Sequence, residues 1–274
     1  MRNRGIWFGV VFLAAVLAVP VLLFLPRDEG GADHPWDFVA SATPATDHSV
    51  LMEGPFPNGP SVTRACLKCH PDAAAQVIKT SHWRWESDPV LVPGHPEPMA
   101  IGKKNLINNF CISVQSNWFK CTSCHVGYGW VDETFDFNDT ENVDCLVCHD
   151  GSGTYVKADG GQPAEGVDLL AVAKSVRRPS RENCGGCHFS GGGGDAVKHG
   201  DLDQSLIYPR DRVDVHMGKH KMICTDCHRA VNHLILGRSI SVSVDHKDAI
   251  ACTDCHAGAP HDDERINLHT GSVA

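Results

Sequence analysis

Twelve of the 13 cysteines lie in six copies of the pattern Cys-x-x-Cys-His, far more than the composition of 274 residues would give by chance. In this pattern two thiols form thioether bonds to the vinyl groups of a haem, and the adjacent histidine is the proximal ligand of its iron. The sequence therefore predicts six covalently attached haem c groups. The cysteines are Cys66, Cys69, Cys121, Cys124, Cys145, Cys148, Cys184, Cys187, Cys224, Cys227, Cys252 and Cys255, followed by His70, His125, His149, His188, His228 and His256.

Two other kinds of site use closely spaced cysteines. Structural zinc needs four ligands from two knuckles, and it gives no reason for a histidine directly after every second cysteine. A disulfide framework suits an exported protein but leaves the same six histidines unexplained. Haem attachment is therefore the favoured interpretation.

Eleven further histidines are available as distal iron ligands. A haem with two histidine ligands is low-spin, has no open coordination position and is suited to electron transfer. His34 and His48 precede the first motif and are expected to be solvated, whereas His95, His220 and His246 resemble loop residues. The preferred candidates are His82, His199, His216, His233, His261 and His269.

Cys111 and the segment after a run of four glycines are the chemically unusual features outside the motifs. Cys111 is either a small buried side chain or a redox-active thiol. Asp195 and Lys198 are three residues apart and share one face if that segment is helical. A deprotonated lysine amine can ligate iron or, when protonated, bind an anion, but spacing alone favours a surface ion pair.

The elements that carry these residues are expected to be short. The motifs start 55, 24, 39, 40 and 28 residues apart, so no fixed repeat is present. Residues 63–274 form the predicted hexahaem cytochrome c domain, whose porphyrins supply much of the interior. Apolar periodicity predicts helices at residues 72–82, with Ala73, Val77 and Ile78 on one face, and at residues 167–176. The fold class is mainly α with extensive coil, organised around packed haems.

The N-terminal segment predicts export. An apolar run from Ile6 to Leu25 follows Arg2 and Arg4, long enough to cross a bilayer with the N-terminus inside. We expect a transmembrane signal anchor at residues 1–26, a tether at residues 27–62 and a haem domain in the periplasm, bound to the inner membrane. A cleaved signal peptide is the alternative, although the run exceeds the usual apolar length. The net charge of −9 argues against a nucleic-acid partner.

Several stretches resemble the octahaem tetrathionate reductase family of periplasmic multihaem cytochromes. They include Lys79-Thr-Ser-His-Trp-Arg-Trp85 and residues 102–111, 121–130, 142–150, 191–203 and 214–217. The resemblance spans about residues 62 to 270. It implies that the second haem is catalytic, with Lys198 in place of the distal histidine and Cys111 and Asp195 nearby. The family carries eight haems, so this chain would be a shortened, six-haem member in which His261 and His269 lack the haems they would serve.

Two functions follow from these features. In the first, electrons from redox partner proteins or a quinol-linked donor pass along the haems to the second haem. There they reduce a small oxyanion or related nitrogen compound, such as tetrathionate, nitrite or hydroxylamine. In the second, the protein is a non-catalytic cytochrome that relays electrons between redox partners. A conductive filament is a third possibility, and the N-terminal anchor argues against it.

Overall fold

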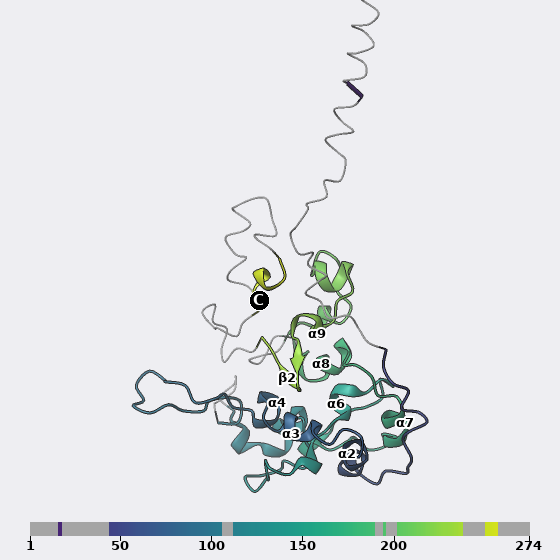
Figure 1. Cartoon of the computed structure of the whole chain (residues 1–274). Helices are drawn as coiled ribbons and strands as arrows, with labels where there is room; N and C mark the ends of the chain where they lie inside the picture. The colour runs from purple at the N-terminus through teal and green to yellow at the C-terminus, as the bar shows by residue number, and fades with distance from the viewer. Residues whose placement is uncertain are drawn as a thin grey trace, which may run out of the picture.

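The computed structural model describes residues 16–17, 44–105, 112–189, 194–195, 202–237 and 250–256. Short helices separated by long coils make up this part of the chain (Figure 1). The α-helices are α2 (Gly59–Leu67), α3 (Ala73–Val77), α4 (Ser81–Arg84), α5 (Trp118–Cys121), α6 (Leu146–His149), α7 (Leu169–Lys174), α8 (Arg181–His188) and α9 (Cys224–Cys227). The strands β1 (Ala230–Val231) and β2 (Leu234–Ile235) form one antiparallel hairpin.

Single helical turns connect these elements. The 3-10 turns are η3 (Val114–Ser116), η4 (Thr122–Cys124), η5 (Thr140–Asn142), η6 (Asp159–Gly161), η7 (Gln204–Leu206) and η9 (Cys252–Asp254), and η8 (Val215–Lys219) is a π-helical turn. The expected fold of mostly helix and coil is therefore confirmed for the described residues.

Each of the six motifs includes at least one residue of a helical turn. The first motif begins in α2, the second spans α5 and η4, and the others lie at α6, α8, α9 and η9. Side chains three positions apart lie on the same side of a helix. The helical turns therefore direct the two thiols of a motif to one side, as attachment to a single haem requires.

The buried apolar side chains form three small clusters, and each cluster packs against motif cysteines. The first, built around Val62, Leu146 and Val172, contacts Cys66. The second contacts Cys145, and the third contacts Cys121 and Cys124. Met52 and Phe56 also pack on the first cluster, so the folded part begins within the segment expected to be a tether.

The predicted helix at residues 72–82 is wrong as one continuous element, because the structure divides it into α3 and α4. Thr80 has an extended backbone at the N-terminal cap of α4, and its hydroxyl donates to the Val77 carbonyl at 2.7 Å. A side-chain bond of this kind competes with the helical bonding of the backbone. The predicted helix at residues 167–176 is present as the shorter α7, which Asp168 caps by accepting from Leu170 N and Ala171 N.

The predicted anchor lies almost entirely outside the described residues. Val16 and Leu17 are helical and exposed. No helix in the part of the chain that the structure describes is long and apolar enough to cross a membrane.

Candidate haem sites and the cavity beside the second motif

None of the twelve motif cysteines forms a disulfide, and several from different motifs lie near one another. Cys66 and Cys145, Cys124 and Cys187, and Cys184 and Cys224 lie close enough for each pair to shift the pKa of its members, and Cys187 Sγ is 3.8 Å from the Cys124 carbonyl oxygen. The first attachment site therefore adjoins the third, and the fourth adjoins both the second and the fifth. The order of the sites in space differs from their order in the sequence.

Three pairs of histidine rings have the spacing expected of two ligands on one metal ion. Metal–imidazole bonds of about 2 Å on opposite sides of an ion separate the two ring centres by roughly 6 Å. The ring centres of His48 and His70 lie 6.4 Å apart, those of His82 and His188 6.2 Å, and those of His216 and His256 6.0 Å. Each pair contains one motif histidine, so the geometry fits an iron with two axial imidazoles.

His48 is the partner that the sequence did not suggest. The expectation of a solvated side chain is wrong, because His48 is partly buried and its Nδ1 lies 2.8 Å from the Thr46 carbonyl oxygen. His149 and His228 likewise place Nδ1 at 2.9 Å and 3.0 Å from the carbonyl oxygens of Arg177 and Leu236. A carbonyl that accepts from Nδ1 fixes the tautomer and leaves Nε2 available to a metal.

His233, another predicted distal ligand, lies in the turn between β1 and β2. Its Nδ1 is 2.8 Å from the amide oxygen Oε1 of Gln76, so its ring is oriented by α3 rather than by a backbone carbonyl. Burial, with the charges of His149 and His70, lowers the pKa of His233. The ring is therefore neutral near pH 7, as iron ligation requires.

The histidine of the second motif differs from these. His125 is fully buried, its Nε2 donates to the Trp83 carbonyl at 2.7 Å, and its Nδ1 has no hydrogen-bond partner among the described residues. Burial lowers its pKa to about 3. Iron would bind at Nε2. His125 can therefore serve as a ligand only if its hydrogen bond to the Trp83 carbonyl is replaced by a bond to iron. The rings around it are Trp83, Trp85, Trp130, Phe135 and Phe137.

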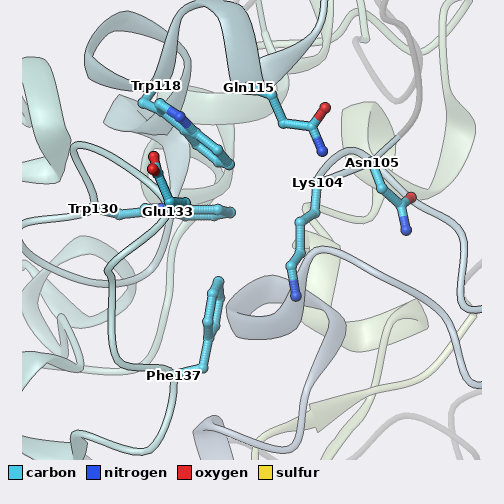
Figure 2. A pocket seen from close by; sticks show the side chains of 7 residues that line it. All are labelled: Lys104, Asn105, Gln115, Trp118, Trp130, Glu133 and Phe137. Atoms are coloured by element: carbon cyan, nitrogen blue, oxygen red, sulfur yellow. The ribbon is translucent and has the colours of Figure 1, made fainter.

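A cavity of about 450 Å³ lies beside this aromatic cluster. In Figure 2 its aromatic side chains stand opposite Lys104 and Asn105. Its lining connects directly to the second motif, because Trp118 begins α5 and Cys121 ends it. The full lining is Lys104, Asn105, Gln115, Trp118, Trp130, Glu133 and Phe137.

Two lysines that sequence reasoning did not single out lie at this cluster. Lys103 Nζ is 4.5 Å from the centre of the Trp85 ring, and Lys104 Nζ is 4.5 Å from that of Phe137. Lys104 also pairs with Glu86 at 3.3 Å. The cavity lining thus carries one cation, Lys104, and one carboxylate, Glu133, beside its aromatic rings.

Of the three predicted catalytic residues, the structure describes Asp195 alone. Asp195 is exposed, and its Oδ1 accepts from the backbone N–H of Gln204 at 3.1 Å. Cys111 and Lys198 lie outside the described residues, as do the candidate ligands His199, His261 and His269. The grouping of Cys111, Asp195 and Lys198 therefore stays a prediction.

Comparison with known proteins identifies the class. No family model matches the chain. An uncharacterized protein of Archaeoglobus fulgidus is 26% identical over 238 residues, which cover 68% of this chain and 79% of that protein. The crystal structure of octahaem cytochrome c from Shewanella oneidensis matches with a TM-score of 0.72 and 47% identity over 82% of this chain.

The fold, the attachment motifs and this match define a multihaem c-type cytochrome. The chain is related to the octahaem cytochrome c of Shewanella oneidensis and matches 51% of the length of that protein.

Proposed function

We propose that this cytochrome carries six haem c groups and reduces a small oxyanion, or a related nitrogen compound such as hydroxylamine, beside its second motif. The observation that carries the proposal is the cavity next to Cys121, where Lys104 and two amide side chains face a wall of aromatic rings. Lys104 and the amides would bind the oxygens of an anion, against the opposing charge of Glu133, while the aromatic side would contact its sulfur or nitrogen. Tetrathionate, nitrite and hydroxylamine are the substrates to test.

The bound haems would supply one-electron redox chemistry, and the protein sets their ligands and surroundings. We assign His48, His82 and His216 as the distal ligands opposite His70, His188 and His256, from the ring spacings given above. His199, His233, His261 and His269 remain candidates for other haems, and Lys198 for the second.

The contacts between motif thiols suggest the route of the electrons. Cys184 and Cys187 of the fourth motif contact thiols of the fifth and the second motif, respectively. The fourth site is therefore a junction, through which electrons from the fifth site would reach the second. Redox partner proteins or a quinol-linked donor would supply them, with the anchor at residues 1–26 holding the haem domain at the periplasmic face of the inner membrane.

The remaining predicted residues would handle the substrate. With tetrathionate, the Cys111 thiolate would attack an S–S bond, release one thiosulfate and keep the other as a mixed disulfide. Two electrons would then release the second thiosulfate and restore the thiolate. Asp195 and Lys198 would hold protons and balance the anionic charge.

An assay of the purified haem-loaded protein tests this function. A reduced dye should be reoxidised on addition of tetrathionate, nitrite or hydroxylamine. Lys104→Met should raise KM for the substrate about tenfold with a smaller change in kcat, because it removes a charge-assisted contact worth about 1.5 kcal/mol. Lys79→Met is the matched control, since Lys79 is exposed and lines no part of the cavity. Failure to reduce any of the three compounds would exclude the reductase.

The second candidate function is a non-catalytic electron carrier, to which the three histidine pairs at the first, fourth and sixth motifs are suited, although none of them includes His125 of the second motif. Two axial imidazoles leave an iron no open position for a substrate. Electron paramagnetic resonance discriminates the functions. If all haems are low-spin with two histidine ligands, the carrier is correct, whereas a distinct signal from the second haem supports the reductase.

A further inference from the structure

The segment from Tyr208 to Lys221 is an exposed cationic surface in a chain whose net charge is −9. It contains four lysine and arginine residues and two aspartates, and its four cations are all exposed: Arg210, Arg212, Lys219 and Lys221. None of the four forms an ion pair with another residue that the structure describes. Their charge is therefore available to a partner of opposite sign.

Apolar side chains are exposed among these charges. Tyr208 is 81% exposed, Val213 48% and Val215 47%. Arginine and aromatic side chains are enriched where proteins contact one another. Charges steer a partner over a distance, and apolar groups add contact area once it has arrived. The 208–221 segment offers both features of a docking surface.

Arg181 of α8 holds this segment in place. Its guanidinium donates to three carbonyl oxygens, those of Ile207 at 3.2 Å, Met217 at 2.8 Å and Met222 at 3.1 Å. In Figure 1 the segment, drawn in green, lies beyond α8 and α9 as seen from α2. Because the surface is fixed before a partner binds, less conformational entropy is lost on association.

The sixth haem site lies at the same surface. Within the segment, η8 carries His216, whose ring centre is 6.0 Å from that of His256 in the sixth motif. The side chain of His216 is 50% exposed, so an iron bound by this pair would lie near the surface. Burial and the charge of Cys255 raise the pKa of Cys227, so the sixth motif adjoins the fifth. The sixth site is therefore the outer end of a route that continues through the fifth and fourth motifs to the second.

We propose that the 208–221 segment is the docking surface for an acidic redox protein, which exchanges electrons with the sixth haem. Opposite charge steers such a partner to the segment, and transient electron-transfer complexes need only a small contact area. The four cations alone would also attract an anionic membrane surface. The position of the haem ligand His216 within the segment favours a redox protein. This inference rests on the electron transfer proposed above, but not on the reduction of any substrate.

Stopped-flow mixing of the oxidised haem-loaded chain with reduced flavodoxin, an acidic one-electron carrier, tests the proposal. Arg212→Glu combined with Lys219→Glu should lower the second-order rate constant of haem reduction about tenfold at low ionic strength, because it reverses the attraction. The difference should disappear at about 1 M salt, where charges are screened within roughly 3 Å. Lys79→Glu combined with Lys174→Glu is the matched control, since both lysines are exposed and the net charge changes equally. An uncharged small reductant should reduce all three proteins at the same rate.

Carbodiimide cross-linking tests the same contact without any substitution. It should join carboxylates of flavodoxin to Lys219 or Lys221, which mass spectrometry of the digested complex would identify. The proposal is overturned if the cross-links lie outside the segment, or if the two double variants are reduced equally fast. It is also overturned if Arg212→Glu with Lys219→Glu weakens binding to vesicles of anionic phospholipid but leaves the flavodoxin rate unchanged. No substrate is present in these experiments, so a failure of the proposed reductase would not affect them.

Discussion

The ring centres of His48 and His70 lie 6.4 Å apart, although the two residues come from separate segments. This distance supports His48 as a distal haem ligand, a role that its place in the sequence does not suggest. His48 lies on coil before α2, where its Nδ1 is fixed by the Thr46 carbonyl. A backbone bond at Nδ1 fixes the tautomer and leaves Nε2 available to a metal. At the scale of residues, the orientation of an imidazole therefore identifies a ligand better than its sequence context.

Replacing His48 tests this assignment. His48→Ala should convert one low-spin haem to a high-spin form, because the iron opposite His70 loses its sixth ligand. Electron paramagnetic resonance and the visible spectrum of the oxidised protein would detect the change. His95→Ala is the matched control, since His95 is exposed on the loop closed by the bridge between Val90 and Met99. If both variants keep the same low-spin signals as the parent protein, His48 is not a ligand.

The sequence predicted the haem attachment residues because a thioether site has a fixed local spacing. It also selected His82 and His216, which the structure pairs with motif histidines. It could not select His48, because a distal ligand is brought to its haem by tertiary packing and needs no local pattern.

At the scale of elements, glycine turns position the second motif. Gly160 and Gly161 in η6 have φ angles of +66° and +72°, which side chains rarely adopt. A Cβ on Gly161 would collide with the Gly127 carbonyl oxygen and lie 3.3 Å from that of Thr122. This close approach lets η6 pack directly on the backbone around Cys124 and His125. The close approach arises from tertiary packing. The sequence, which shows only two adjacent glycines, therefore does not predict it.

Gly161→Ala should therefore destabilise the protein more than an equivalent change elsewhere. Gly153→Ala is the control, because Gly153 has the same φ of +72° but nothing within 4 Å of the position that a methyl group would take. Both variants lose about 1 kcal/mol from the left-handed backbone, and Gly161→Ala loses about 1–3 kcal/mol more from the collision. Thermal unfolding measures the difference. Equal melting temperatures for the two variants would contradict the packing argument.

At the scale of the whole molecule, the three buried apolar clusters are small, and each contacts at least one motif cysteine. Haems attached to those cysteines would lie between the clusters and extend the apolar interior of the part of the chain that the structure describes. Two histidines, His82 and His125, are buried deeply enough that burial lowers the pKa of each. Their burial links stability to pH.

Stability should fall as the pH decreases below about 6.5. Burial lowers the pKa of His125 to about 3 and, with the charges of His188 and His228, that of His82 to about 4. Below pH 6.5 the unfolded chain binds protons that the folded chain does not, so each histidine removes up to about 1.4 kcal/mol of stability per pH unit until its folded pKa is reached. Thermal unfolding between pH 6.5 and 5 isolates this effect from the titration of carboxylates. The measurement uses the protein without haem, because iron would hold the same imidazoles in the haem-loaded protein. His82→Gln should make the slope shallower there, and an equal slope in the two proteins would refute the assignment.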